Sequence, residues 1–284
     1  MFAHLFLYYP VTTYLLLGLL ALSIGSLLNV IIYRLPLMLQ SEWTSQCCEL
    51  LNIPGESKST PNLFFPRSYC PFCKHMIQAW QNIPIVSFCI LKGRCAHCHH
   101  KISLQYPLVE LTCLSLSLIA VYYFGLTLSL LYAWLFIWIT ICLCFIDIQH
   151  QLLPDSLVLG LLWLGLIANT QDLFTTLPNA VLSAVGAYLA LWIVVKLFYL
   201  ITRKVGMGQG DLKLFAAFGA YFGWTALPAI LLMSSLIGAI VGVVYLRITK
   251  QTKETPIPYG PFLCAAGLIQ LFYGKYIIMW YVGG

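Results

Sequence analysis

The stretch CFIDIQHQLLPDSLVLG, from Cys144 to Gly160, joins two long apolar runs through a short polar turn. Asp147 stands at the end of the first run and Asp155 at the start of the second. Carboxylates are costly in the hydrocarbon core of a bilayer, so acids near that depth usually carry a function or have a partner. The stretch therefore predicts two membrane helices that meet at an end marked by acids.

The overall composition predicts a polytopic helical membrane protein. Of the 284 residues, 61% are hydrophobic and only 8% are charged, whereas a typical soluble domain has about 25% charged residues. The formal net charge of +6 is better explained by basic residues gathering in cytoplasmic loops than by binding to nucleic acid. We expect the lipid bilayer, and no nucleic acid, among the partners.

Eight apolar runs are candidate membrane spans, since a helix needs roughly 20 apolar residues to cross the bilayer. The fourth and sixth are short, and each follows an acidic loop. No internal repeat is apparent. The runs are Val11–Tyr33, Leu108–Phe124, Thr127–Ile148, Asp155–Ala168, Asn179–Ile201, Leu212–Phe222, Thr225–Leu246 and Phe262–Val282.

Lysine and arginine place the chain in the membrane. They gather after the first, fifth and seventh runs, which share one side if every run crosses, and Lys275 is the exception on the other side. Basic residues mark the cytoplasmic side, so both termini are expected outside. The predicted parts are a first transmembrane helix (1–34), a cytoplasmic domain (35–107) and transmembrane helices 2–8 (108–284). The basic residues that mark the predicted cytoplasmic side are Arg34, Lys58, Arg67, Lys74, Lys92, Arg94, Lys101, Arg203, Lys204, Lys213, Arg247, Lys250 and Lys253.

Two Cys-x-x-Cys pairs lie in the large loop, with 21 residues between them: Cys70 with Cys73, and Cys95 with Cys98. Such pairs supply four thiolates to one tetrahedral ion at a spacing close to that of a zinc ribbon. Disulfides are the alternative, which a loop facing the reducing cytoplasm disfavours. Four thiolates leave no open position, so the pattern predicts a structural zinc that holds a small loop domain together.

Four of the nine acids stand at span ends on the predicted cytoplasmic side: Glu110, Asp147, Asp155 and Asp211. Asp147 closes the third span and Asp211 opens the sixth, so these two can meet across a helix bundle. Adjacent carboxyls share one proton, and such a pair can activate water and protonate a leaving group. Helix dipoles would favour the Asp211 anion and leave the shared proton on Asp147. The simpler alternative is that Asp211 only caps its helix.

The neighbours of these acids have both structural and functional interpretations. Gly208 and Gly210 before Asp211 would let an extended substrate approach the backbone, or merely form a turn. Asp155 follows a proline in a common helix-start pattern, which favours either a structural role or a role in supporting the catalytic residues. Glu110 can form a structural ion pair with Arg34. Lys213 either tunes Asp211 or is one more basic residue of the cytoplasmic side.

Eight motifs spread over the chain are informative together: GSLLNVIIYRLPLML, EWTSQCCELL, PRSYCPFCKHMI, NIPIVSFCILKGRCAHCHHKIS, YPLVEL, FIDIQHQLLPD, GMGQGDLKLFAAFGA and IPYGPFL. Together these motifs resemble those of the type IV prepilin peptidases, which are bifunctional leader peptidases and N-methyltransferases of pilus and type II secretion systems. The resemblance covers nearly the whole chain. Leu28 and Gln105 depart from the residues most frequent in that family.

This resemblance implies that Asp147 and Asp211 are the catalytic pair of a membrane aspartyl protease and that the four loop cysteines bind metal. It implies prepilin and pseudopilin substrates, cut after the glycine of a basic leader on the cytoplasmic side of the bacterial inner membrane. It also implies methylation of the new N-terminus by S-adenosylmethionine. The cofactor-binding residues stay unknown, since no glycine-rich fingerprint follows a strand. Gly25, Asn29 and Arg34 lie near the membrane end of the loop domain, although Gly25 equally suits tight helix packing.

Two other classes of protein are alternatives. A proton-coupled transporter would carry membrane acids, usually near the midplane and with an inverted repeat, neither of which is evident. A zinc-containing scaffold subunit of a secretion machine would carry the cysteine site without chemistry.

Overall fold

The computed structural model describes residues 10–53, 62–63, 68–70, 72–78, 85–204, 206–249 and 257–282. Of the basic loop residues noted above, Lys58, Arg67, Lys250 and Lys253 lie outside these ranges. The described secondary structure is helical apart from two isolated β-bridges, Tyr69 with Met76 and Arg94 with Lys101. The chain divides into two compact units, Met1–Tyr122 and Tyr123–Gly284.

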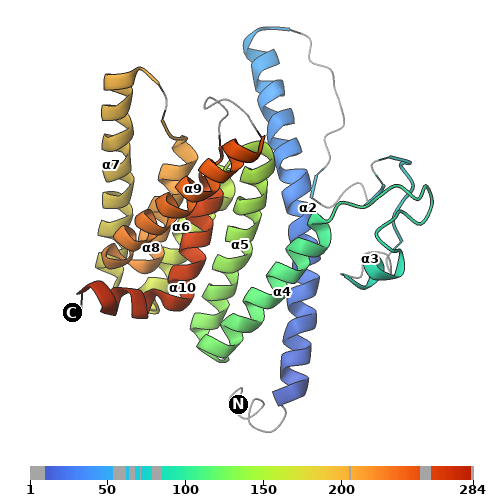
Figure 1. Ribbon diagram of the computed structural model, residues 1–284, viewed down its shortest axis with the longest axis horizontal. Coiled ribbons are helices and arrows are strands. Elements are labelled where there is room, and N and C mark those ends of the chain that lie inside the picture. The colour runs from blue at the N-terminus through green and yellow to red at the C-terminus, as the bar shows by residue number, and fades with distance from the viewer. Residues whose placement is uncertain are drawn as a thin grey trace. The chain divides into compact units, whose positions relative to one another are not determined.

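The first unit is built on α2 (Pro10–Leu50), with the short α3 (Val86–Ile90) and with α4 (Gln105–Phe124) (Figure 1). With 41 residues, α2 is about 60 Å long at 1.5 Å per residue. It continues well past the predicted end of the first span at Tyr33 and includes Pro36. Good helix formers such as Leu, Met, Gln and Glu after Pro36 explain why the helix continues into an exposed polar segment.

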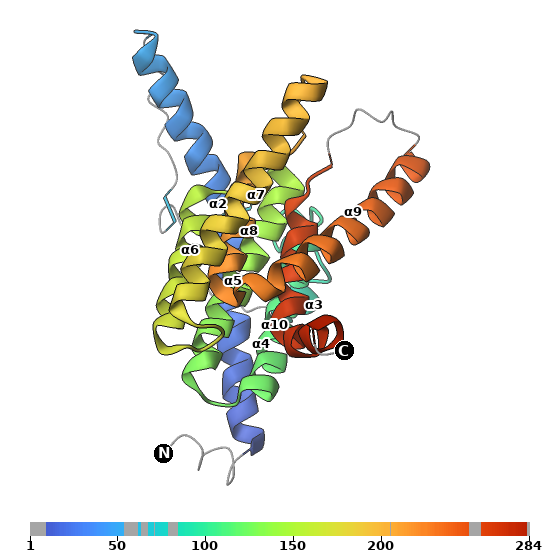
Figure 2. The ribbon, with the colours of Figure 1, turned by 90° about the vertical axis from the view of Figure 1, so that its left-hand side faces the viewer.

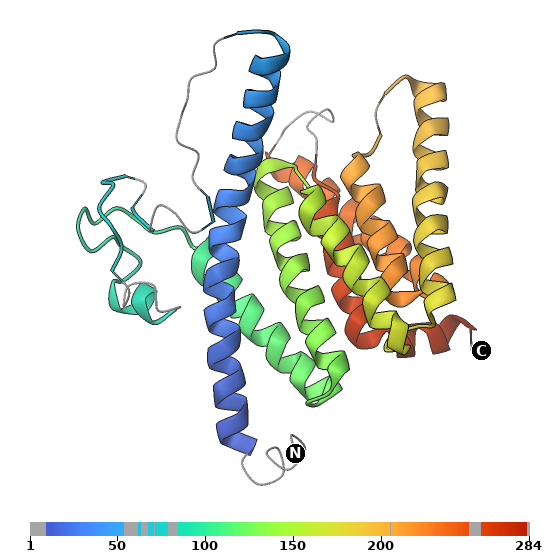
Figure 3. The same cartoon turned by 180° about the vertical axis from the view of Figure 1, so that it is seen from behind.

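The helices α2 and α4 cross closely at Gly25, and the two ribbons meet in both Figure 1 and Figure 3. A Cβ atom at Gly25 would lie 3.0 Å from Cα of Glu110 and 3.3 Å from Cβ of Cys113. The absence of a side chain lets the two backbones approach, as small residues do between membrane helices. Gly25 therefore has the packing role that its residue type suggested.

In the part of the second unit that the structure describes, six α-helices reverse direction one after another: α5 (Leu128–His150), α6 (Asp155–Ala168), α7 (Leu177–Thr202), α8 (Gln209–Phe222), α9 (Leu227–Thr249) and α10 (Gly260–Val282). Short 3-10 turns, η2 (Asn169–Gln171) and η3 (Trp224–Ala226), join α6 to α7 and α8 to α9. The ends of α5, α7 and α9 and the starts of α6, α8 and α10 consequently lie at one end of the unit (Figures 1 and 2).

Helix α8 is the centre of this unit, because it is apolar on nearly all sides and its residues from Leu214 to Phe222 are buried. Glycines allow its neighbours to approach. A Cβ at Gly219 of α8 would lie 2.8 Å from the carbonyl oxygen of Ser183 in α7, and one at Gly165 of α6 would lie 2.6 Å from the ring of Tyr221. An enclosed helix of this kind can be short, since it need not reach both membrane surfaces.

Asn169 holds the C-terminal end of α8. Its side chain is fully buried, and its Nδ2 donates to the carbonyls of Ala220 and Tyr221 at 2.8 and 3.0 Å. Its Oδ1 accepts hydrogen bonds from the N–H groups of Phe174 and Thr175. These bonds satisfy carbonyls that a helix end leaves without partners. The helix is thus fixed at one end while Asp211 stands in its first turn at the other.

Six of the predicted spans are long and apolar enough to cross a membrane, which confirms an all-α polytopic fold with a cysteine-containing loop domain. The two short ones, α6 and α8, have 14 residues each, or about 21 Å against a hydrocarbon core of about 30 Å. The number of eight spans therefore stays a prediction. Large apolar side chains are exposed on α7 and α9, for example Leu182, Ile193, Leu200, Leu232, Leu236 and Ile240, as expected of surfaces that face lipid.

Candidate active site and metal centre

Asp147 lies in the last turn of α5 and is buried. The helix ends because Gln151 adopts a left-handed conformation (φ 51°) and donates its N–H to the carbonyl of Asp147 at 2.9 Å. Pro154 then precedes α6 in an extended conformation. This short reversal keeps the Asp147 side chain at the end of the unit where α8 and α10 begin.

Asp211 lies in the first turn of α8 and is also buried. Its carboxylate accepts a hydrogen bond from the backbone N–H of Gly208, the residue that caps the helix. Its Oδ1 is buried without a hydrogen-bond partner in the described part of the chain. Because an unpaired buried acceptor is costly, this oxygen is placed to receive a proton, a water or a substrate group.

The structure brings the two aspartates together, since the carboxyl of Asp147 is close enough to interact electrostatically with that of Asp211. Two thiols lie beside them, because Cys144 of α5 interacts with Asp147 and Cys264 of α10 interacts with both acids. Each carboxyl is also aligned by a backbone N–H from a glycine. This arrangement suits a pair of carboxyls that share one proton.

Gly260, in the first turn of α10, was not predicted to contact the pair. Its backbone N–H donates a hydrogen bond to the Asp147 carboxylate. The neighbouring Tyr259 is held by Ser234 of α9, with 2.7 Å between the two hydroxyl oxygens. Asp147 therefore faces a helix N-terminus, as Asp211 does. At Asp147 the dipole of α10 therefore opposes that of α5, whose last turn holds this residue. A resting proton on Asp147 stays a prediction.

We expect Gly260→Ala to lower peptide cleavage about 100-fold, the cost that a shift of about 1 Å in a reacting group can have. A Cβ at this position would lie 2.5 Å from Oδ2 of Asp147 and would displace the carboxylate. Gly160→Ala in α6 is the matched control, because a Cβ there meets nothing within 4 Å. Equal cleavage rates for both variants, measured on a synthetic substrate peptide, would contradict this role for Gly260.

Lys213 and Asp155 form an ion pair. The Nζ atom of Lys213 lies 2.7 Å from both carboxylate oxygens of Asp155, and the two side chains are partly exposed. The pair links the start of α6 to the start of α8, which is the structural role predicted for Asp155. The partner of Lys213 shown here is thus Asp155 and not Asp211.

The glycines before Asp211 have contacts within the protein. A Cβ at Gly210 would lie 2.8 Å from Cβ of Leu153, so the close approach that this glycine permits is to the turn before α6. Gly208 has φ −71° and ψ 148°, which any residue can adopt. A substrate lying against this backbone therefore stays a prediction, whereas the packing role of Gly210 is visible.

The four loop cysteines converge in the first unit. The sulfur atoms of Cys70, Cys73, Cys95 and Cys98 all lie within 4.8 Å of one another, and those of Cys70 and Cys98 are 3.9 Å apart. Four sulfurs each about 2.3 Å from a tetrahedral zinc ion would be separated by about 3.8 Å. The donor set and its spacing therefore fit a closed structural zinc site.

The two cysteine pairs repeat each other in structure, and both segments have the pattern C-x-x-C-x-H-x-I, from Cys70 to Ile77 and from Cys95 to Ile102. In the first, the N–H of Cys70 donates to the carbonyl of His75 and the N–H of Lys74 to the carbonyl of Cys70. In the second, the N–H of Cys95 donates to the carbonyl of His100 and the N–H of His99 to the carbonyl of Cys95. Lys74 and His99 both have positive φ, at 58° and 55°. Each knuckle thus turns its two thiols to the same side, which brings all four together.

The thiols have unequal affinities for protons. Backbone N–H groups of Cys98 and His97 lower the pKa of Cys95 to about 7. At Cys98 the N–H of His100 acts in the same direction, but the partial loss of hydration beside the other thiols and the hydrogen bonds with those thiols outweigh it and raise the pKa to about 11. Crowded thiols resist joint ionisation because their charges repel, and a cation that binds them removes that resistance.

Glu110 and Arg34, for which an ion pair was the simpler expectation, have backbone partners in the structure. The carboxylate of Glu110 accepts a hydrogen bond from the N–H of Ile85 at 2.8 Å. The guanidinium of Arg34 donates to the carbonyls of Asn62 and Leu63 at 2.8 and 3.3 Å. Both side chains are buried. Arg34 holds the backbone of Asn62 and Leu63 against α2, and Glu110 holds that of Ile85 against α4.

Two family models match this chain. A model described as the bacterial peptidase A24 N-terminal domain matches residues 19–124, and one described as the type IV leader peptidase family matches residues 134–243. A prepilin leader peptidase/N-methyltransferase of Legionella pneumophila is 58% identical over 276 residues, or 97% of this chain and 96% of that relative. The chain belongs to the type IV leader peptidase family.

Other members of the family are less similar but match over almost the same length. Proteins of the same name from Stutzerimonas stutzeri and Pseudomonas aeruginosa are 49% and 48% identical, each over 93% of this chain and 91% of the relative. The first family model spans the four cysteines and the second spans Asp147 and Asp211. No solved structure matches the chain.

Proposed function

We propose that this protein cleaves the leader from type IV prepilins and pseudopilins and methylates the new N-terminus, and so serves pilus biogenesis and type II secretion. The observation that carries the peptidase activity is the buried pair of Asp147 and Asp211, with Oδ1 of Asp211 unpaired in the described part of the chain. The relatives named prepilin leader peptidase/N-methyltransferase support both activities.

The carboxyls divide the work of amide hydrolysis between them. One carboxylate takes a proton from water, the water oxygen attacks the scissile carbonyl, and the protonated partner hydrogen-bonds the carbonyl oxygen. The proton held by the pair then passes to the amine nitrogen as the C–N bond breaks. The backbone N–H groups of Gly208 and Gly260 keep the two carboxyls oriented through this exchange.

The methyl transfer requires a donor and an exposed amine. When bound, S-adenosylmethionine supplies a methyl group that the amine lone pair takes as the C–S bond breaks, leaving S-adenosylhomocysteine and a proton for the solvent. The chain's own residues must hold the donor and exclude water around it. We assign zinc a structural role, held by Cys70, Cys73, Cys95 and Cys98, because four thiolates leave no open coordination position.

Topology connects the sites with the substrate. We propose that the protein lies in the bacterial inner membrane with both termini periplasmic, on the basis of the basic residues after the first, fifth and seventh predicted spans. The aspartate pair would then border the cytoplasm, where the basic leader of a prepilin remains while its apolar helix occupies the bilayer.

The proposal is tested with the purified full-length chain in lipid nanodiscs and a synthetic prepilin. Mass spectrometry should show loss of the leader and, when S-adenosylmethionine is added, a mass increase of one methyl group on the mature peptide. An intact prepilin after prolonged incubation would refute the peptidase. Cleavage without methylation would limit the protein to the first activity.

A further inference from the structure

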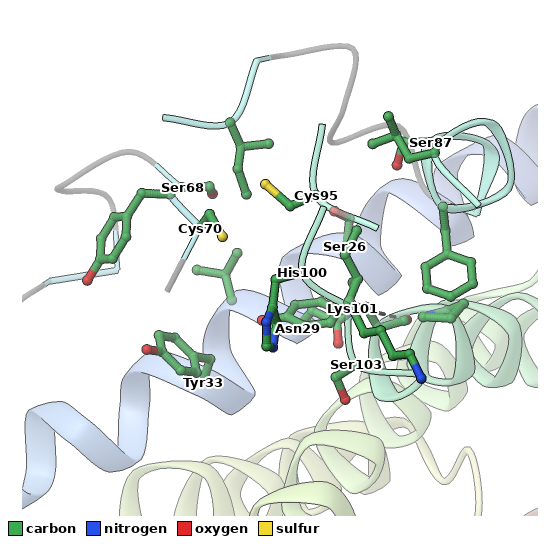
Figure 4. Close-up of a pocket in the computed structure, with 18 of the residues that line it drawn as sticks. Ser26, Asn29, Tyr33, Ser68, Cys70, Ser87, Cys95, His100, Lys101 and Ser103 are labelled. Carbon is green, nitrogen blue, oxygen red and sulfur yellow. Dashed lines mark hydrogen bonds between the residues drawn. The ribbon is translucent and has the colours of Figure 1, made fainter. Parts of the chain in front are cut away.

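The first unit contains a cavity of about 550 Å³ bounded by α2, the start of α4, α3 and the two cysteine knuckles. This size falls within the roughly 300–1,000 Å³ typical of small-molecule sites. Figure 4 shows Tyr33 and Asn29 on α2 below Cys70, Cys95 and His100 of the knuckles. The aspartate pair belongs to the other unit, so its chemistry does not account for this cavity.

Aromatic rings form much of the cavity wall. The ring of Phe72 stacks on that of His100, with centroids 3.3 Å apart. The phenol groups of Tyr33 and Tyr106 are close enough to interact, and Phe88 adds a further face. Such walls suit a flat heterocycle, and they also attract a cation that carries little hydration.

Three buried polar side chains interrupt these apolar walls: Asn29, Arg34 and Glu110, with 5%, 7% and 7% of their surface exposed. Each is held by a backbone group, since Asn29 donates to the carbonyl of Tyr106 at 3.1 Å, Glu110 accepts from Ile85 and Arg34 donates to Asn62 and Leu63. Burying charged side chains is costly unless they serve a contact. A positively charged and a negatively charged side chain around one cavity point to a ligand that itself carries both positive and negative charge.

We infer that this cavity binds the methyl donor S-adenosylmethionine, an inference that rests on the proposed methyltransferase function. The donor has a flat adenine that can stack on the aromatic walls and hydroxyl groups that can donate to the Glu110 carboxylate. Its own carboxylate can bind the cationic side chains of Arg34 and Lys101. Its sulfonium is a weakly hydrated cation of the kind that aromatic faces attract. The Glu110 carboxylate disfavours a lipid phosphate or a nucleotide phosphate, because like charges repel in a buried site.

The test is direct binding of S-adenosylmethionine to the full-length protein, measured by isothermal titration calorimetry. Glu110→Gln keeps an oxygen that can accept from Ile85 but removes the charge, so donor affinity should fall about 10- to 100-fold. Tyr33→Ala removes an aromatic wall at a half-exposed position and should also weaken binding. Glu49→Gln, on the exposed C-terminal end of α2, is the matched control and should bind like wild type.

Location is tested separately by ultraviolet crosslinking of radiolabelled donor and peptide mapping. Label on peptides that contain Tyr33 or Tyr106 supports the inference, and label confined to residues 123–284 overturns it. Normal donor affinity in both Glu110→Gln and Tyr33→Ala, with wild-type methylation, would overturn the inference and leave the proposed function standing. A wild-type protein that neither binds donor nor methylates would overturn both. Displacement of the donor by phosphatidylglycerol vesicles, but not by S-adenosylhomocysteine, would assign the cavity to lipid.

Discussion

Asp147→Asn and Asp211→Asn should each reduce cleavage of a synthetic prepilin by about 1,000-fold or more, because acid and base catalysis are lost together. An amide cannot share a proton as a carboxyl does. Each substitution preserves the shape of a buried side chain, and the hydrogen bond from Gly260 or Gly208 keeps an acceptor oxygen. The double variant should be no worse than either single one, since the two groups act as a unit.

The variants must be shown to be folded. Removing one buried carboxylate from an adjacent pair relieves repulsion and desolvation, so we expect thermal stability equal to or above that of wild type. Methylation of a peptide supplied in its cleaved form should continue in both variants, because the donor cavity belongs to the other unit.

Asp155→Asn is the matched control for this experiment. Asp155 lies at the same end of the second unit as the pair, but its side chain is 59% exposed and bound to Lys213. Exposed ion pairs contribute little to stability, so loss of this pair should leave the fold and the aspartate pair intact. Cleavage by this variant should therefore stay within about twofold of wild type. Full cleavage by Asp147→Asn or by Asp211→Asn would show that the pair is not the hydrolytic centre.

The parts of the fold that follow from local composition could be predicted from the sequence. The start of α6 is an example, because Pro154 and Asp155 form a helix-start pattern beside an apolar run, and the helix has the predicted bounds Asp155–Ala168. The meeting of Asp147 with Asp211 was predictable as well, because alternating spans bring the end of one helix to the start of another. The convergence of the four loop cysteines likewise follows from their spacing.

Roles that depend on distant neighbours were not predictable. Gly260 looks like an ordinary helix start, and only the fold places its N–H on Asp147. Asn169 looks like a polar residue after an apolar run, and its role at the end of α8 requires a partner 51 residues away. The extension of α2 beyond Tyr33 was missed because the apolar pattern ends there, although the residues that follow Pro36 favour a helix.

Purified protein should contain close to one zinc ion per chain, because its four loop thiolates complete a single tetrahedral site. Cys70→Ser should release the metal and unfold the loop domain, since structural zinc contributes roughly 10–16 kcal/mol in small zinc-binding peptides. Cys73 and Cys95 are only partly buried and Cys98 is exposed, so a chelator should reach the ion and have the same effect. Zinc is measured by inductively coupled plasma mass spectrometry.

Limited proteolysis separates loss of metal from loss of structure. Lys74, Arg94 and Lys101 are exposed beside the knuckles, yet hydrogen bonds such as Cys70 to His75 and Cys95 to His100 hold the backbone in tight turns that a protease cannot bind. Removing zinc should therefore make all three sites open to trypsin, while the helices of the second unit resist. Cys47→Ser, at an exposed position in α2 outside the cluster, should keep its zinc and its resistance. Zinc content and trypsin resistance that are unchanged in Cys70→Ser would mean that the sulfurs converge through packing alone and that another interaction holds the knuckles together.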